Sequence, residues 1–232
     1  MSSYEDESFP ATPFVLVVDQ SESMQSNDGI ETVNRELAEL VNTLSAIPEV
    51  EETASIGLIS FAERATVHRR IEPIINGIEL PTFEALGATS FAAPLEALRS
   101  LIASDVPRLS RRGRRPIAFF ITDGRPNYEK DKEWRAARAR LLEPGFRLRP
   151  KLVTMGCGSV ERECLEELAS TPELAQWEAG PTQSALEAIL QTVTQTIITL
   201  SGDPEPGDDF AGRIFRFDYE VGEDEVIEYG DP

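Results

Sequence analysis

Long apolar runs are missing from this sequence. No stretch approaches the roughly 18–20 consecutive apolar residues that a membrane-spanning helix needs. Hydrophobic residues nevertheless make up 41% of the 232-residue chain, which is ordinary for a globular protein. Residues 1–13 are polar and acidic, and they lack the basic start and the apolar stretch of a signal peptide. We therefore expect a cytoplasmic protein without a membrane segment.

Thiol and imidazole groups are also scarce, since the chain has two cysteines and one histidine. Six residues separate Cys157 from Cys164, and nothing near them has the spacing of zinc ligands. In a reducing compartment we expect both to be free thiols. His68 falls on the surface of a predicted edge strand, and no Gly-x-Ser-x-Gly motif is present, so a Ser-His-Asp hydrolase has little support.

Positive charge is the third shortage, because 41 acidic residues oppose 22 basic ones and give a formal net charge of -19. Such a surface repels nucleic acids and anionic membranes, and it favours cationic partners and metal ions. Eleven acidic residues and only two arginines lie between Asp203 and the end of the chain. In contrast, the arginine cluster Arg108–Arg115 holds five arginines in eight positions. We interpret this cluster as a solvated loop, with pairing to the acidic tail or to an acidic partner as the alternative.

Short β-branched or aromatic runs alternate with longer segments of helical periodicity. This pattern predicts a three-layer, Rossmann-like α/β fold with a mostly parallel six-stranded sheet and helices on both faces. Only three residues separate Ile56–Phe61 from Ala65–Ile71, too few for a crossover helix, so the second run should be an antiparallel edge strand. The other predicted strands are 14–18, 117–121, 152–155 and 175–179, and the predicted helices are 31–47 (ended by Pro48), 91–102, 131–142, 162–169 and 184–200.

The predicted domain covers residues 13–201, after an N-terminal extension of residues 1–12. Residues 202–232 form an acidic C-terminal tail that begins with Gly-Asp-Pro-Glu-Pro-Gly-Asp-Asp, a linker by composition. Alternating apolar residues then follow at Phe215, Phe217, Tyr219 and Val221. This tail forms either a docked strand or hairpin or a disordered segment. We interpret Trp134 and Trp177 as packing residues.

Three polar motifs are expected at one edge of the sheet. Asp19-Gln-Ser21-Glu-Ser23 directly follows the first strand, and Thr122-Asp123-Gly directly follows the strand that ends at Ile121. A third loop, Gly87-Ala-Thr89-Ser90, can reach the same edge, where open α/β sheets bind ligands. Asp19, Ser21, Ser23, Thr89 and Asp123 supply two carboxylates and three hydroxyls. This all-oxygen set suits Mg²⁺ or Mn²⁺ better than zinc.

These motifs resemble the metal-ion-dependent adhesion site (MIDAS) of von Willebrand factor A (vWA) domains, and the resemblance covers residues 12–200. The runs Val-Val-Asp-Gln-Ser-Glu-Ser-Met and Phe-Phe-Ile-Thr-Asp-Gly-Arg-Pro-Asn are most similar to bacterial intracellular members of the TerY-like, tellurium-resistance type. The five site residues match the family pattern. Glu22 departs from it, because the family usually has glycine at this position.

The resemblance implies a site for protein binding and no catalysis. Ser21, Ser23 and Thr89 would contact the metal through their hydroxyls, and Asp19 and Asp123 would act directly or through water. A carboxylate from a partner protein would fill the open coordination position. The TerY-like relatives also imply a role in a bacterial stress-response or signalling assembly, in association with protein kinases and phosphatases.

Two other functions stay open. The first is a Mg²⁺-dependent phosphoryl-transfer hydrolase with Asp19 as nucleophile. Such enzymes need a second acid two residues later, where this chain has Ser21, and no Gly-x-x-x-x-Gly-Lys-[Ser/Thr] loop is present. The second is a scaffold that binds through the arginine cluster or the acidic tail without the metal.

Overall fold

A six-stranded sheet forms the centre of the computed structural model, which describes residues 12–109, 112–128, 130–201 and 226–228. Its strand order is β3-β2-β1-β5-β6-β7. All neighbours pair in parallel except β2 and β3, which are antiparallel. The predicted three-layer fold with one antiparallel edge strand is therefore confirmed. The six strands are β1 (Thr12–Asp19), β2 (Ala54–Phe61), β3 (Ala65–Pro73), β5 (Ile117–Thr122), β6 (Lys151–Gly156) and β7 (Ala175–Trp177). The strands β4 (Arg112–Arg114) and β8 (Val226–Glu228) form a separate sheet.

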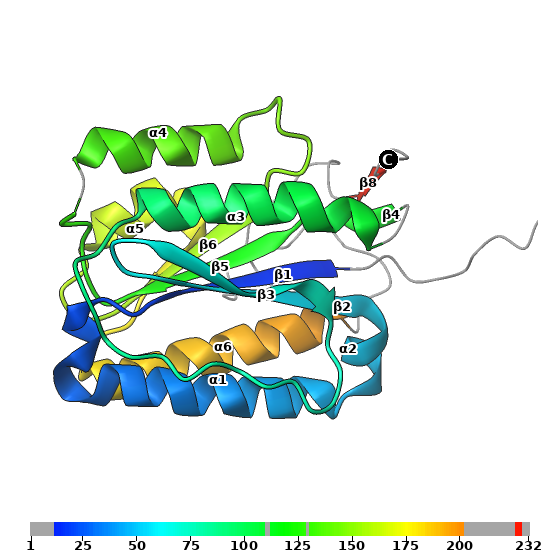
Figure 1. The fold of residues 1–232 in the computed structure, drawn as a ribbon, viewed down its shortest axis with the longest axis horizontal. Coiled ribbons are helices and arrows are strands. Elements are labelled where there is room, and N and C mark those ends of the chain that lie inside the picture. Colours follow the sequence, from blue (N-terminus) through cyan, green and yellow to red (C-terminus); the bar gives the residue numbers. More distant parts are fainter. Residues whose placement is uncertain (1–11, 110–111, 129, 202–225, 229–232) are drawn as a thin grey trace, which may run out of the picture.

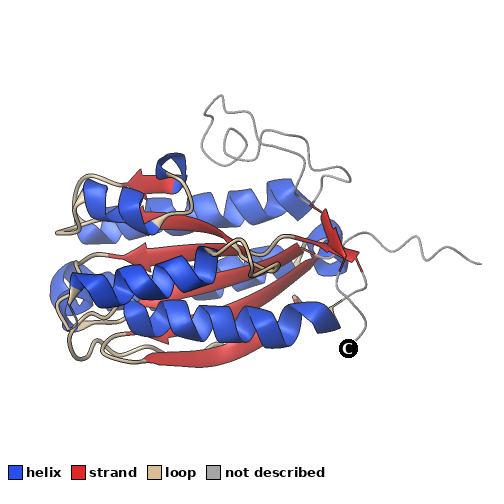
Figure 2. Ribbon diagram, turned by 90° about the horizontal axis from the view of Figure 1, so that it is seen from above, coloured by secondary structure: helices blue, strands red, loops and turns tan. Residues whose placement is uncertain are grey.

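Helices cover both faces of this sheet. Figure 1 shows α1, α2 and α6 below it and α3, α4 and α5 above it. In Figure 2, turned by 90°, the helices and strands run along the same long direction. The α-helices are α1 (Gly29–Ser45), α2 (Pro48–Thr53), α3 (Ala92–Asp105), α4 (Asp131–Leu142), α5 (Arg162–Leu168) and α6 (Thr182–Ser201), and the 3-10 turns are η1 (Glu22–Asp28), η2 (Val106–Arg108) and η3 (Pro172–Leu174).

Strand β1 is apolar throughout because it contributes to two cores. Successive side chains of a strand point to opposite faces. Phe14, Leu16 and Val18 therefore pack with α1 and α6, whereas Val15 and Val17 pack with α3 and α4. All five are at most 1% exposed. Burial on both faces fixes the register of β1, and with it the position of the residues that follow its carboxyl end.

Two local predictions were wrong. The first long helix ends at Ser45 instead of residue 47, and Pro48 begins α2 instead of ending α1. Proline is well suited to the first turn of a helix, where its missing N–H would have no intrahelical acceptor. Trp134 is 1% exposed and packs in the core as predicted, but Trp177, at the end of the short strand β7, is 43% exposed.

A second, two-stranded sheet lies at the end of the molecule where β1 begins. Strand β8, from the acidic tail, pairs antiparallel with β4, which belongs to the arginine cluster (Figure 1). Arg114 of β4 is 9% exposed and donates a 2.6 Å hydrogen bond to the carbonyl of Leu200 in the last turn of α6. The rest of the tail and residues 1–11 lie outside the described residues, so the division into domain, extension and tail stays a prediction.

Candidate metal centre

Three loops meet at the carboxyl edge of the sheet, at the left in Figure 1. Strands β1 and β5 are parallel neighbours, with Val18 opposite Ile121, so the residues that follow them come out side by side. The third loop is tied to the first by two backbone hydrogen bonds, from the Glu22 N–H to the Gly87 carbonyl and from the Leu86 N–H to the Gln20 carbonyl. The predicted convergence of the three motifs is therefore present in the structure.

Asp19 lies at the base of the site and is 0% exposed. Its Oδ1 accepts a 2.7 Å hydrogen bond from the backbone N–H of Ser21, which turns the chain sharply after β1. Its Oδ2 accepts a 2.5 Å hydrogen bond from the hydroxyl of Thr122 on β5. Asp19 thereby fixes the first loop and links it to the neighbouring strand.

Ser21, Ser23 and Asp123 form a continuous chain of hydrogen bonds above Asp19. The hydroxyl oxygens of Ser21 and Ser23 are 3.1 Å apart, and the Ser23 hydroxyl donates to Oδ1 of Asp123 over 2.6 Å. Ser21 is 1% exposed and Asp123 is 5% exposed, whereas Ser23 is exposed. A serine proton that points to a carboxylate leaves the lone pairs of the same hydroxyl oxygen available to a cation.

Thr89 brings the third hydroxyl to this group. It is 2% exposed, its N–H donates to Oδ1 of Asn127 over 2.7 Å, and its carbonyl accepts the N–H groups of Asn127 and Tyr128. A Cβ atom added to Gly124 would lie 3.4 Å from the Ser23 hydroxyl oxygen and 3.8 Å from the Thr89 hydroxyl oxygen. The glycine after Asp123 therefore leaves open the space that these two hydroxyls share.

The two carboxylates of the site are costly to ionise in the metal-free protein. Burial raises the pKa of Asp19 to about 6, and the nearby charge of Asp123 adds to this effect, against the lowering by hydrogen bonds from Ser21 and Thr122. Burial also raises the pKa of Asp123, against the hydrogen bond from Ser23. Desolvated negative charges favour a cation, because a cation removes the cost of ionising them.

The donor set fits a hard divalent cation. Within the described ranges, no group of three or more His, Cys, Asp or Glu residues is placed so that it could hold a metal ion. Cys157 is buried and its thiol is free, and burial, with further contributions from Asp123 and Asp19, raises its pKa to about 12. In the metal-free protein this thiol is therefore protonated at neutral pH. The site offers two carboxylates and three hydroxyls, a set of oxygen donors that fits a divalent cation.

The sequence missed three residues that build the site. Thr122 holds Asp19, Asn127 holds Thr89, and Gly124 leaves the shared space. Thr122 and Gly124 belong to the predicted motif, so a polar residue at the end of a buried strand was an available signal. Asn127 gave none, because its role depends on how its loop folds back. His68 is exposed on β3 as predicted, and it pairs with the hydroxyl of Ser60 at 2.7 Å.

The family model of the von Willebrand factor type A domain matches residues 14–192, which is more than half of the chain. This chain belongs to the von Willebrand factor type A domain family. The match includes the three loops that carry the candidate metal ligands. Among curated protein sequences, none matches this vWA chain.

Several solved structures share the vWA fold. Proximal thread matrix protein 1 from the mussel byssus, with a zinc-occupied MIDAS motif, is 16% identical over 80% of this chain and 46% of that one, with a TM-score of 0.57. The pilus adhesin SpaC from Lactobacillus rhamnosus GG is 15% identical over 83% of this chain and 31% of that one, with a TM-score of 0.65. The vWF domain of the pili tip protein Mfa5 from Porphyromonas gingivalis is 10% identical over 87% of this chain and 99% of that one, with a TM-score of 0.61. This chain spans about half the length of the mussel protein. At such identities the similarity shows the fold alone.

No helix in the described part of the chain is both long enough and apolar enough to span a membrane.

Proposed function

We propose that this chain is a metal-dependent protein–protein interaction module whose MIDAS-type site binds a carboxylate of a partner protein. The observation that carries the proposal is the convergence of Ser21, Ser23 and Asp123 through hydrogen bonds of 3.1 and 2.6 Å, above Asp19 and beside Thr89. These five residues are the ones that the family resemblance assigns to the metal.

The proposed ion is Mg²⁺ or Mn²⁺, held by the hydroxyls of Ser21, Ser23 and Thr89 together with Asp19 and Asp123. When bound, it supplies an electrophilic centre that attracts a further oxygen ligand. Two carboxylates balance the charge of a divalent ion without exceeding it, so a third carboxylate is still attracted. Mg²⁺ prefers about six oxygen ligands, which leaves a position for this third carboxylate.

The related structures support binding over catalysis. A mussel matrix protein and two pilus proteins are named for structural or adhesive roles. The hydrolase alternative has weaker support, because the acid that it needs two residues after Asp19 is replaced by Ser21, which is 1% exposed and hydrogen-bonds to Ser23. We therefore infer that the site performs no reaction.

The cellular setting rests on the resemblance to TerY-like proteins of the tellurium-resistance type. That resemblance supports a cytoplasmic bacterial protein in a stress-response or signalling assembly, with protein kinases or phosphatases as associated proteins. The resemblance rests on residues 17–24 and 119–127, which contain the site loops that follow β1 and β5.

A pull-down in Mg²⁺ and in EDTA tests the proposed function. Tagged wild-type protein, Ser23→Ala and the matched control Ser100→Ala are compared, since Ser100 is an exposed serine on α3 whose hydroxyl donates to the Glu96 carbonyl of its own helix. We expect a partner to be retained by wild type and Ser100→Ala in Mg²⁺, and to be lost in EDTA and with Ser23→Ala. A partner that all three retain in EDTA would contradict the metal bridge and favour the scaffold alternative through the arginine cluster or the tail.

A further inference from the structure

Two exposed apolar side chains belong to segments that are bonded to the loops of the candidate metal centre. Among the described residues, five large apolar side chains are exposed: Val67, Ile75, Leu86, Tyr128 and Trp177. Single exposed apolar residues are common and need no explanation. Leu86 and Tyr128 differ from an isolated case, because both are 50% or more exposed and both are bonded through their backbones to the loops that hold the metal ligands.

Leu86 is fixed on one side of the site. Its N–H donates a 2.8 Å hydrogen bond to the carbonyl of Gln20, the residue after Asp19. The adjacent Gly87 has a φ of +71°, which a residue with a side chain rarely adopts, and its carbonyl accepts the Glu22 N–H over 3.0 Å. Leu86 is 50% exposed although its backbone is held at two neighbouring points. This residue therefore presents a rigid apolar surface three positions before Thr89.

Tyr128 is fixed directly to Thr89 through its backbone. The N–H groups of Asn127 and Tyr128 both donate to the Thr89 carbonyl, at 2.9 and 3.1 Å, and Asn127 also accepts the Thr89 N–H. Tyr128 is 59% exposed, the highest value among these apolar side chains. The proposed metal ligand Thr89 is thus connected to both apolar residues, to Tyr128 by a hydrogen bond and to Leu86 along the chain.

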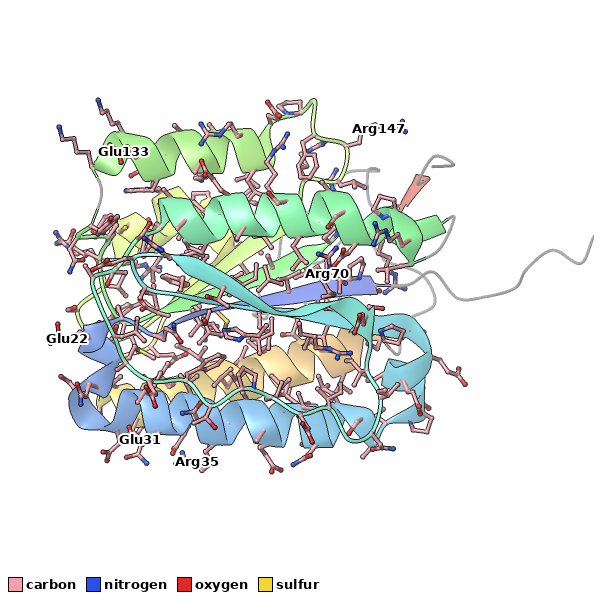
Figure 3. All side chains as sticks on the ribbon, in the orientation of Figure 1. Glu22, Glu31, Arg35, Arg70, Glu133 and Arg147 are labelled. Atoms are coloured by element: carbon pink, nitrogen blue, oxygen red, sulfur yellow. The ribbon has the colours of Figure 1, made fainter. Side chains whose placement is uncertain are left out.

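The charge differs between the surroundings of Leu86 and those of Tyr128. Glu22 follows directly on Ser21, and Oε1 of Glu63 accepts the N–H of Ala88, two residues after Leu86, over 3.4 Å. In the described structure neither carboxylate has a basic partner, and Figure 3 shows Glu22 at the left end, where the central strands end. On the Tyr128 side, Arg125 forms an ion pair with Glu161 and is neutralised.

We propose that the partner presents an extended segment in which one acidic residue is flanked on both sides by large apolar residues, with a lysine or arginine on the side that contacts Glu22 and Glu63. The acidic residue binds the metal, and the apolar residues pack on Leu86 and Tyr128. This inference rests on the proposed function, which supplies the carboxylate ligand. It adds a reason why a chain of net charge -19 can bind an acid at all, because basic surroundings offset the repulsion.

Selection from a peptide library tests the inference without knowledge of the natural partner. The probe is a displayed library of nine-residue peptides with glutamate fixed at the centre and the other positions random. The library is bound to the full chain in Mg²⁺ and eluted with EDTA. We expect the eluted peptides to be enriched in large apolar residues on both sides of the glutamate and in lysine or arginine on one side.

The outcomes separate this inference from the function on which it rests. Eluted peptides with random or acidic flanks would overturn the inference and leave the metal–carboxylate function intact. Failure of EDTA to release any enriched peptide would contradict the proposed function, and the inference would fall with it. A parallel library with glutamine at the centre should yield no EDTA-dependent binders.

Variants then locate the contact on the protein. We expect Leu86→Ala and Tyr128→Ala each to weaken binding of a selected peptide by about fivefold or more. Ile75→Ala is the matched control, because Ile75 is 54% exposed but follows β3 at the opposite edge of the sheet, and it should change the affinity less than twofold. Glu63→Gln should weaken the binding of peptides that carry a basic residue, whereas Glu51→Gln on α2 should leave their binding unchanged. All variants should keep the Mn²⁺ affinity of wild type, and equal peptide affinities for Leu86→Ala, Tyr128→Ala and wild type would overturn the assignment.

Discussion

Asp19 has two structural roles that precede any metal. One of its oxygens turns the loop through the Ser21 N–H, and the other holds the Thr122 hydroxyl of the next strand. Both bonds favour the ionised form, yet burial dominates and raises the pKa to about 6. Full burial beside Asp123 is an unfavourable position for an anion, and the bound cation would offset that cost.

At the scale of single residues, Asp123→Asn should separate stability from metal binding. The amide keeps the size of the side chain and an oxygen that accepts the Ser23 hydroxyl, but it removes a charge that burial makes costly. We expect the metal-free variant to be as stable as wild type or more stable in urea, with the affinity for Mn²⁺ at least about tenfold lower. Equilibrium unfolding in EDTA and electron paramagnetic resonance of Mn²⁺ measure the two effects.

Asp105→Asn is the matched control for this substitution. Asp105 is 4% exposed, similar to Asp123 at 5%, but its carboxylate forms an ion pair with Arg70 and accepts the Ile71 N–H. Here the amide should reduce the free energy of unfolding by about 1–3 kcal/mol and leave Mn²⁺ affinity unchanged. The same effect on stability from both substitutions would contradict the claim that burial makes the charge of Asp123 costly.

Metal affinity should depend on pH through the same carboxylates. The pKa of Asp19 is about 6 in the folded protein against 3.8 as the ordinary value, so a proton competes with the metal below pH 6. We expect the affinity for Mn²⁺ to fall by about tenfold for each pH unit below 6 and to level off above it. In EDTA the stability of the protein should change with pH in the opposite direction. Because the pKa of Asp19 is higher in the folded protein than in the unfolded chain, stability should be lost as the pH rises from about 4 to 6. Titrations at pH 5, 6, 7 and 8 measure the first effect, and an affinity that is equal at pH 5 and 7 would contradict it.

At the scale of elements, the metal loops depend on how η1 joins α1. Gly29 begins α1 with a helical φ of -61°, so glycine is not needed there for its backbone conformation. A Cβ at this position would lie 2.7 Å from the carbonyl oxygen of Met24, a backbone atom that cannot move aside. The turn that contains Glu22 and Ser23 therefore packs directly on the first residue of the helix.

Gly29→Ala should be destabilising although alanine is the better helix former. The gain in helix propensity is about 1 kcal/mol, but the backbone clash costs more, so we expect a net loss of about 1–2 kcal/mol and a weaker affinity for Mn²⁺. Gly145→Ala is the control, because a Cβ there meets no atom within 4 Å, and it should be neutral or slightly stabilising. Urea midpoints measure both, and a stabilised Gly29→Ala variant would show that the turn can shift without cost.

The ends of elements show which parts of the fold were predictable. The alternation of apolar strands and amphipathic helices fixed the sheet, and the two motifs that directly follow β1 and β5 were placed correctly because a parallel pair brings their carboxyl ends together. Bonds that depend on loop conformation were not predictable, such as Asn127 to Thr89. The exposure of Trp177 was missed because it depends on how far the neighbouring elements cover the last residue of a three-residue edge strand, which the residue type does not reveal.

At the scale of the whole molecule, the net charge of -19 complicates any test of metal binding. A strongly negative protein is stabilised by cations in general, because screening reduces its self-repulsion. A specific site adds a separate effect that depends on the ratio of metal concentration to the dissociation constant. Only a comparison at equal ionic strength distinguishes the two.

Mg²⁺ should therefore raise the melting temperature more than NaCl of the same ionic strength. At about 100 times the dissociation constant, specific binding adds about 2.7 kcal/mol, which corresponds to a rise of about 5–10 °C for a domain of this size. Asp123→Asn should lose at least about half of the difference between Mg²⁺ and NaCl, since it keeps nearly all of the negative surface but binds the metal at least about tenfold more weakly. Calorimetry with both salts measures the difference. An equal rise for wild type in the two salts would assign the effect of Mg²⁺ to screening and would remove the metal from the proposed function.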